Sequence, residues 1–182
     1  MLFEELELAG LYRVELEPRI DQRGFFSRLF CTDAFERAGL NPSIVQVNNT
    51  LTKERGSVRG LHFQRPPKAE TKLVRCVRGA VWDVAVDLRA GSPTFGKWAS
   101  LELTEENRTM VYIPHGFAHG FQTLQPSTEL IYFHSEEYSA ECEGAVSPAD
   151  RQLNINWPLQ ITCMSDRDQN HPTLDELEPI AI

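Results

Sequence analysis

The chain consists of short apolar runs that alternate with polar residues and end at turn residues. The runs lie at 11–17, 25–30, 44–50, 72–78, 80–88, 98–103, 109–113, 117–124 and 129–134, with turns such as 21–24 (DQRG) and 91–93 (GSP) between them. Alternation with a period of two predicts β-strands, because successive side chains of a strand point to opposite faces. Only residues 32–38 have helical spacing, with Thr32 as the expected N-cap and Gly39 at the end. Many short strands and one helix predict an antiparallel barrel or a double-sheet jelly roll.

Length and composition narrow the class of protein. A chain of 182 residues suits one domain, so we expect residues 1–182 to form a single domain with a loop-rich tail after Asp150. No apolar stretch has the length of a membrane span, and the first ten residues are acidic rather than signal-like. The net charge of −8 argues against a nucleic-acid partner. Four cysteines without a CxxC pair predict free thiols, and we expect a soluble, cytoplasmic protein.

The most informative motif is residues 59–64 (RGLHFQ), which places a histidine inside an alternating run. In an extended conformation His62 and Gln64 share the face opposite Leu61 and Phe63. A histidine that faces the inside of a small barrel titrates near neutrality and can take or give a proton. The alternative is a core histidine whose ring nitrogens are both hydrogen-bonded.

Four further side chains complete a possible acid–base set around His62. Asp168 is a candidate to hold the ring in one tautomer and to stabilise the imidazolium. Tyr132 and Tyr138 are candidate donors of a phenolic proton, and Lys72 is a candidate to stabilise an anionic oxygen. The alternatives are tyrosines that only pack in strands and a solvated lysine at a strand start.

The remaining histidines differ in their surroundings. His119 lies among small and apolar residues that allow close approach of a ligand, whereas His115 follows a proline in a turn and is the weaker candidate. His134 and His171 lie in polar stretches, so we expect them to be solvated.

A second class of candidate residues suits a nucleotide. Arginines near turns, together with amide side chains, can bind a diphosphate and a nucleobase, and this class contains Arg23, Arg59, Gln46 and Asn48. The alternative is that the arginines only solvate the rim of a barrel.

The residues predict no catalytic metal. Metal-binding proteins of the cupin type usually supply two histidines one residue apart, a carboxylate shortly after, and a later histidine. In this chain Gln64 occupies the position two residues after His62, and Glu70 comes late for the carboxylate.

Taken together, these motifs closely resemble the dTDP-4-dehydrorhamnose 3,5-epimerases, sugar-nucleotide epimerases of the cupin superfamily. The resemblance covers almost the whole chain. It rests on residues 21–26 (DQRGFF), 46–48 (QVN), 59–64 (RGLHFQ), 72–74 (KLV), 83–89 (DVAVDLR), 91–96 (GSPTFG), 114–121 (PHGFAHGF), 155–158 (INWP) and 165–168 (SDRD), with Tyr132 and Tyr138. It implies a cupin-type jelly roll with short helices, no metal or other cofactor, and a homodimer whose chains exchange strands.

The resemblance also implies an activity and residue roles. The activity is inversion of C3, C5 or both in a nucleoside-diphosphate (expected to be dTDP) 4-keto-6-deoxy sugar, in rhamnose-type biosynthesis. His62 is the implied base, Asp168 its partner, Tyr132 the proton donor, and Lys72 the group near the C4 oxygen. The side chains implied around the nucleotide sugar are Arg23, Gln46, Asn48, Arg59, His119 and Glu143, with Tyr138 as a further contact.

Some positions depart from the family pattern. Arg28 stands where many members carry a glutamate, Arg167 where a lysine is common, and residues 147–151 (SPADR) lack the usual Trp and Asp-Pro. One extra residue lies between Gln46 and Arg59, and we expect these departures to lie near the ligand rim. The alternatives are a single-centre epimerase or 3,4-ketoisomerase, a metal-dependent cupin enzyme, and a non-catalytic sugar-nucleotide binding protein.

Overall fold

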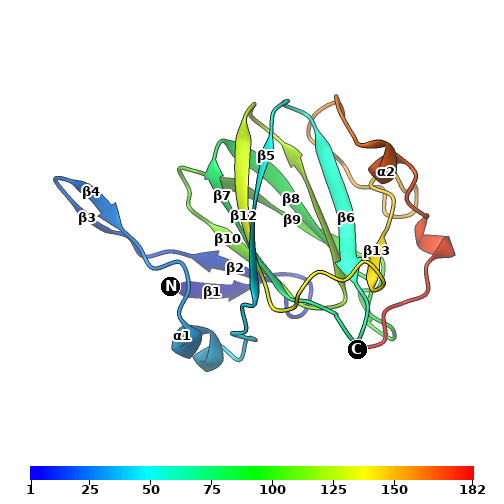
Figure 1. Ribbon diagram of the computed structural model, residues 1–182, viewed down its shortest axis with the longest axis horizontal. Coiled ribbons are helices and arrows are strands. Elements are labelled where there is room, and N and C mark those ends of the chain that lie inside the picture. The colour runs from blue at the N-terminus through cyan, green and yellow to red at the C-terminus, as the bar shows by residue number, and fades with distance from the viewer.

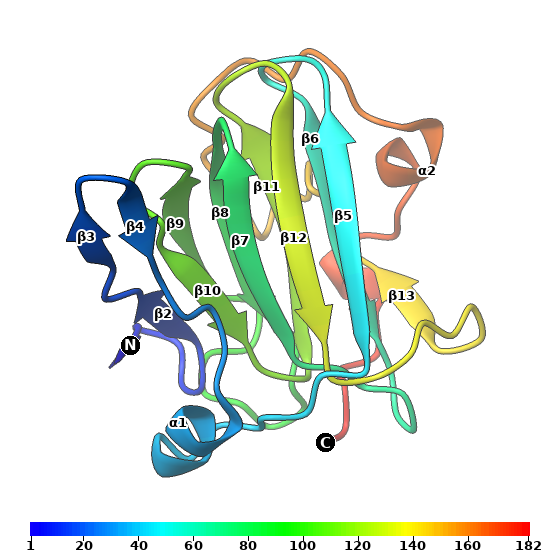
Figure 2. The same ribbon diagram turned by 60° about the vertical axis from the view of Figure 1, so that its left-hand side comes forward.

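Two antiparallel sheets face each other in the computed structural model, which describes residues 1–182 (Figures 1 and 2). The six-stranded sheet has the order β1 (Leu2–Glu5), β2 (Tyr12–Glu15), β10 (Met110–Ile113), β7 (Lys72–Arg78), β12 (Thr128–His134) and β5 (Gln46–Thr52). The five-stranded sheet has the order β13 (Glu143–Ala145), β6 (Val58–Gln64), β11 (Phe117–Thr123), β8 (Ala80–Asp87) and β9 (Trp98–Thr104). The predicted all-β jelly-roll fold is confirmed.

The main core lies between the two sheets. The six-stranded sheet contributes Val74, Cys76, Val111, Ile113 and Leu130, and the five-stranded sheet contributes Val81, Ala85, Leu101, Leu103, Phe117 and Phe121. These residues are the inward-facing members of the alternating runs, so burial of one face of each strand accounts for the sandwich.

The tail covers the outer face of the five-stranded sheet. Leu61 and Phe63 on β6 pack there with Leu153, Leu174 and Ile180 from the tail. The tail contains α2 (Asp166–Gln169) and the 3-10 helix η1 (Leu174–Glu176), and Figure 2 shows α2 beside β6. Strand β6 is therefore packed on both faces, with Arg59 and His62 as its exposed and partly exposed members, and this packing positions the histidine that it carries.

The N-terminal third carries a projecting hairpin. Strands β3 (Arg19–Asp21) and β4 (Gly24–Phe26) pair only with each other and extend away from the body (Figure 1). Helix α1 (Thr32–Arg37) follows, and its Phe35 packs on the outer face of the six-stranded sheet near Tyr112.

Three local predictions need correction. The N-cap of α1 is Cys31, not Thr32, because Cys31 has extended backbone angles and Thr32 is already helical. The strand predicted at 25–30 ends at Phe26, because its partner β3 begins at Arg19, which pairs with Phe26. Strand β1 was not predicted, since the first ten residues were interpreted only as an acidic stretch. No helix has the length and apolar character that crossing a membrane requires.

Strands β6 and β11 approach each other closely at Gly60, which has a φ of +123°. A Cβ at this position would lie 2.6 Å from the Gly120 Cα and 2.7 Å from the His119 carbonyl oxygen. Gly24 has a similar φ of +130° but no neighbouring atom within 4 Å of its Cβ position. The two glycines therefore share a backbone constraint and differ in steric crowding.

We expect Gly60→Ala to destabilise the protein more than Gly24→Ala. Both variants incur backbone strain of about 1–3 kcal/mol. Only Gly60→Ala adds overpacking, which typically costs a further ~1–3 kcal/mol. Urea unfolding of both variants measures the difference in the free energy of unfolding, and equal losses would contradict the crowding at Gly60.

Candidate active site

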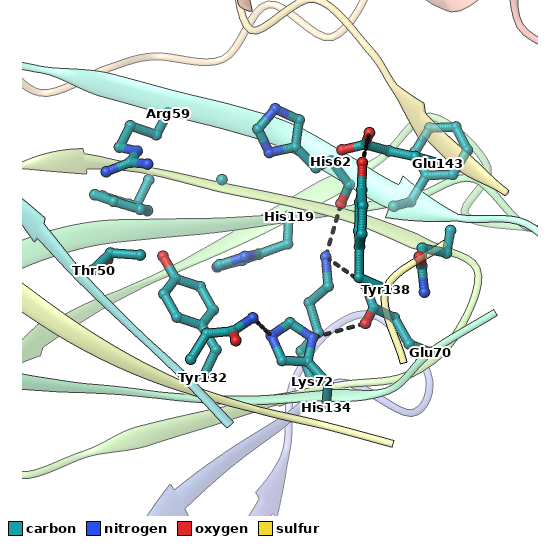
Figure 3. A pocket seen from close by; sticks show the side chains of 15 residues that line it. Thr50, Arg59, His62, Glu70, Lys72, His119, Tyr132, His134, Tyr138 and Glu143 are labelled. Carbon is teal, nitrogen blue, oxygen red and sulfur yellow. Dashed lines mark hydrogen bonds and ion pairs between the residues drawn. The ribbon is translucent and has the colours of Figure 1, made fainter. Parts of the chain in front are cut away.

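A cavity of about 210 Å³ lies between the two sheets, and we call it the inter-sheet cavity (Figure 3). The predicted site residues that line it are His62, Lys72, Tyr132, Asn48, Arg59, His119, Tyr138 and Glu143. Arg59, His62 and His119 come from the five-stranded sheet, while Asn48, Lys72 and Tyr132 come from the six-stranded sheet. Residues far apart in the sequence thus meet because the jelly roll folds the two sheets together.

His62 is bonded to a carboxylate from the tail. Its Nε2 lies 2.9 Å from Asp168 Oδ1, and the other carboxylate oxygen accepts the backbone N–H of Gly60 at 3.3 Å. Burial opposes ionisation of Asp168, but the contacts with His62, Gly60 and His171 outweigh it and lower its pKa to about 2. Asp168 is thus an anion at neutral pH. It holds Nε2 as the protonated nitrogen, which leaves Nδ1 of His62 free to accept a proton.

His119 lies beside His62 and has a carboxylate partner of its own. The two histidines are paired across strands β11 and β6. His119 Nε2 lies 2.8 Å from Asp83 Oδ2, and both side chains are buried. Burial raises the pKa of Asp83 above its ordinary value, although the contact with His119 opposes the change. The wall of the cavity therefore carries two histidine–carboxylate pairs side by side.

Lys72 is buried and held by two acceptors. Its Nζ donates to the His62 carbonyl oxygen at 3.1 Å and lies 3.2 Å from Glu70 Oε1 (Figure 3). Burial opposes ionisation of Glu70, but Lys72 and His134 outweigh it and lower the pKa of this carboxyl below its ordinary value. An ammonium group has three donors. Two are accounted for by His62 and Glu70, and the third remains for an oxygen of a ligand in the cavity.

Tyr132 comes from the sheet opposite to His62. Its ring contacts those of His119 and His134, with centroids 5.9 Å and 6.0 Å away. Burial raises the pKa of Tyr132 far above its ordinary value, and the nearby Asp83 adds to the effect. The phenol therefore stays protonated at neutral pH and is available as a proton donor.

Charged and polar groups gather at the rim. The Tyr138 hydroxyl donates to Glu143 Oε2 at 2.9 Å, and Arg167 forms an ion pair with the same carboxylate. Burial opposes ionisation of Glu143, but Arg167 and Tyr138 lower its pKa below the ordinary value. Gln46 does not line the cavity; its side-chain oxygen accepts the backbone N–H of Tyr138 at 3.0 Å.

A second cavity of about 540 Å³ adjoins the first and shares Arg59 and His62 with it. Together the two cavities offer room for a ligand longer than a single sugar ring.

Arg23 lies outside both cavities. It is on the projecting hairpin, where its guanidinium pairs with Asp21 at 2.6 Å and is 84% exposed. Within one chain, Arg23 is the predicted site residue that the fold does not bring near the others.

Two predictions about histidines are wrong. His134 was expected to be solvated, but it is buried, with Nδ1 2.7 Å from Glu70 Oε2 and Nε2 3.3 Å from Asn48 Nδ2. His171 was also expected to be solvated, but its Nε2 lies 3.1 Å from Asp168 Oδ1. The expectation for His134 failed because its partners Glu70 and Asn48 are distant in the sequence. The expectation for His171 failed because the local pattern does not reveal how the preceding helix α2 docks against β6.

Two buried carboxylates that contact the site residues were not predicted to belong to the site. Asp83 and Glu70 position His119 and Lys72 respectively. The available signal for Asp83 was an acidic residue inside the apolar run 80–88, where burial requires a partner.

The expected location of the sequence departures is partly wrong. Arg167 does lie at the rim, through its pair with Glu143. Arg28 instead lies on the surface near Glu17 and Arg37, and residues 147–151 lie in the tail that covers the outer face of the five-stranded sheet. Neither Arg28 nor any of residues 147–151 lines the inter-sheet cavity of its own chain.

We expect the Asp168 carboxylate to contribute stability that disappears in acid. Its pKa falls from 3.8 to about 2 on folding, so the contribution is present above about pH 4 and is lost as the pH falls through about 2. The difference in the free energy of unfolding between wild type and Asp168→Asn should therefore shrink between about pH 4 and pH 2. Urea unfolding over this range measures it. Asp166→Asn, which removes an exposed carboxylate from the same helix, is the matched control, and a constant difference for Asp168→Asn would contradict the prediction.

Known proteins are similar to this chain in sequence and in fold. A family model described as dTDP-4-dehydrorhamnose 3,5-epimerase matches residues 5–176. A dTDP-4-dehydrorhamnose 3,5-epimerase from Sinorhizobium fredii is 44% identical over 178 residues, which are 97% of this chain and 91% of that protein. The Legionella pneumophila dTDP-6-deoxy-D-glucose-3,5-epimerase, solved in complex with dTDP-4-keto-L-rhamnose, superposes with a TM-score of 0.91. It is 36% identical, and the match covers 97% of this chain and 94% of that one.

A third relative acts at one centre. ChmJ, a 3'-monoepimerase from Streptomyces bikiniensis solved in complex with dTDP-quinovose, superposes with a TM-score of 0.88 at 38% identity. That match covers 93% of this chain and 86% of ChmJ. The predicted family and the predicted class of enzyme are confirmed, and the matches do not favour a ketoisomerase or a metal-dependent enzyme. The chain belongs to the dTDP-4-dehydrorhamnose 3,5-epimerase family and is an epimerase.

Proposed function

We propose that the enzyme inverts both C3 and C5 of a dTDP-linked 4-keto-6-deoxy sugar, in the synthesis of a rhamnose-type deoxysugar. The observation that carries the proposal is the inter-sheet cavity, where His62 backed by Asp168 and the phenol of Tyr132 come from opposite sheets. The substrate class is supported by the names of the relatives, which are epimerases of dTDP-4-dehydrorhamnose.

The reaction needs a base, an acid and a stabilised oxygen. The C–H bonds next to a ketone are acidic because the carbanion spreads onto the C4 oxygen. Nδ1 of His62 removes the proton, and Asp168 stabilises the imidazolium that forms. The free donor of Lys72 faces the developing enolate oxygen.

Inversion requires that the proton returns on the other face of the sugar. Tyr132 is the donor, because it comes from the sheet opposite His62 and its raised pKa keeps the phenol protonated. Acid–base catalysis by each of these groups typically contributes about 10²–10⁴-fold.

The other lining residues hold the substrate. His119 and Asn48 offer hydrogen bonds to sugar hydroxyls, and Glu143 and Tyr138 close the rim. Arg59 lies where the two cavities meet, which suits a diphosphate that links the sugar to its nucleoside.

We expect His62→Ala to abolish the exchange of the C3 and C5 hydrogens with deuterium from solvent. Tyr132→Phe should retain part of the exchange but turn over poorly, because His62 still removes the proton and can return a deuteron on the same face, whereas return on the opposite face, which inverts the centre, is lost. Proton NMR of dTDP-4-keto-6-deoxyglucose in D₂O measures both, and losses of at least about 10²-fold in epimerisation are expected.

His115→Ala, which removes an exposed histidine in a turn, is the matched control and should exchange like wild type. Unchanged exchange in His62→Ala would remove His62 as the base, and full epimerisation by Tyr132→Phe would remove Tyr132 as the acid. Wild-type exchange confined to C3 would instead indicate a single-centre epimerase, the activity that ChmJ is named for.

The enzyme is proposed to act as a homodimer that exchanges its hairpin. Ile20 and Phe26 on the hairpin are 75% and 70% exposed, and Val47 and Leu51 on β5 are about half exposed. Strand β5 is an edge of the six-stranded sheet, so its backbone is free to pair with another chain. Exposed apolar side chains beside an open edge favour association with a second copy. The hairpin then brings Arg23 to the partner's cavities, where it binds the diphosphate.

Hybrid dimers test this use of Arg23. We expect Arg23→Ala and His62→Ala each to be impaired alone, but their co-expressed mixture to recover activity. In a hybrid, one site combines an intact His62 with Arg23 of the other chain. Random pairing makes half of the dimers hybrid with one intact site each, so about a quarter of wild-type activity is expected. Absence of recovery, with hybrids verified by differential tags, would place Arg23 in the site of its own chain or in none.

The remaining proposals concern the domain organisation of the chain and its location in the cell. Residues 1–182 are proposed to act as one domain, since the family model spans 5–176. The cytoplasm is the proposed location, because Cys31, Cys76, Cys142 and Cys163 are free thiols.

A further inference from the structure

Three metal-ligating side chains converge where strand β6 meets helix α2. Ring nitrogens of His62 and His171 lie 2.9 Å and 3.1 Å from the same Asp168 oxygen. The three ligand atoms all lie within 4.8 Å of one another. The rings of His62 and His171 are perpendicular, with centroids 5.3 Å apart, so both present an edge nitrogen to the carboxylate.

We propose that this cluster is an inhibitory binding site for a borderline divalent cation such as Zn²⁺. Two imidazoles and a carboxylate suit Zn²⁺, Cu²⁺ or Ni²⁺, whereas Mg²⁺ and Ca²⁺ prefer oxygen ligands alone. Zinc binds such ligands at about 2.0–2.2 Å, which places tetrahedral ligand atoms about 3.3 Å apart. The two histidine–Asp168 contacts are a few tenths of an ångström shorter than this, so small side-chain movements admit the ion.

The surroundings complete the site. The His62 side chain is 35% exposed, which leaves solvent access for a water as the fourth ligand. The second oxygen of Asp168 accepts the Gly60 N–H, so the carboxylate is already oriented by a neighbour outside the cluster. This site lies at the junction of barrel and tail. It shares His62 with the position of the missing His-x-His pair but takes its other two ligands, Asp168 and His171, from the tail.

Occupation of the site disables the proposed base by changing its tautomer. A neutral imidazole has one N–H and one lone pair. When Nε2 of His62 gives its lone pair to the metal, the proton must reside on Nδ1, which can then no longer accept one from the substrate. The cation also takes the Asp168 oxygen that supports the imidazolium. Metal binding and catalysis are therefore mutually exclusive, a step of the inference that rests on the proposed role of His62.

The test combines direct binding with activity. Calorimetric titration of chelator-treated protein with Zn²⁺ should show one binding site per chain. Zn²⁺ should also suppress deuterium exchange, and EDTA should restore it. Mg²⁺ should neither bind at this site nor suppress exchange. His171→Asn keeps an N–H donor for Asp168 but loses the imidazole ligand. Because loss of an outer partner already costs about 10–100-fold in metal affinity, loss of this ligand should weaken Zn²⁺ binding at least about 10-fold. Inhibition of each variant is expressed relative to its own metal-free rate.

Cys163→Ser and His115→Asn are matched controls, because both remove exposed metal-ligating side chains outside the cluster. They should bind Zn²⁺ like wild type. Equal Zn²⁺ affinity of His171→Asn and wild type, or an equally large loss in Cys163→Ser, would overturn the site. Binding of Zn²⁺ at the cluster with no effect on deuterium exchange would support the metal site but overturn its inhibitory role. Calorimetry does not depend on turnover, so failure of the proposed epimerase reaction can be distinguished from failure of Zn²⁺ to bind.

Discussion

The site depends on one buried carboxylate that the tail inserts against the barrel. Asp168 is 4% exposed, and its oxygens contact the Gly60 N–H and the rings of His62 and His171. Its own backbone N–H donates to the Ser165 side chain at the start of α2. A buried carboxylate without such partners is strongly unfavourable. The contacts of Asp168 that hold the tail against the barrel are therefore the same contacts that orient the proposed base, His62.

Paired charges explain how a polar cavity persists inside a small barrel. Asp83 faces His119, and Glu70 lies between Lys72 and His134. Each of these two carboxylates is thus matched by a cation or a ring nitrogen, which offsets the cost of desolvation. Tyr132 carries no charge at neutral pH, so it needs no counter-ion and remains free to donate its proton to a ligand.

The sequence predicted the parts of the structure that depend on near neighbours. Alternation and turns located most strands, and the short motifs identified His62, Lys72 and Tyr132 as members of one site. Prediction was harder where the outcome depends on distant contacts. His62 and Asp168 are separated by 106 positions, so the residue types alone offered Asp168 only as a candidate partner, and the family resemblance then implied the pair. His134 illustrates the same limit, because its burial depends on Glu70, 64 positions away.

The packing of the tail explains why an altered segment outside the cavity still bears on the site. Asp150, within the departing segment 147–151, is buried and accepts the backbone N–H groups of Leu153 and Leu174. The Trp157 indole donates to the Pro148 carbonyl oxygen in the same segment and packs edge-on against Trp82 of β8. These contacts anchor the tail on the outer face of the five-stranded sheet, and the tail in turn carries Asp168. Substitutions in this segment are thus expected to act on the support of the base rather than on recognition of the sugar.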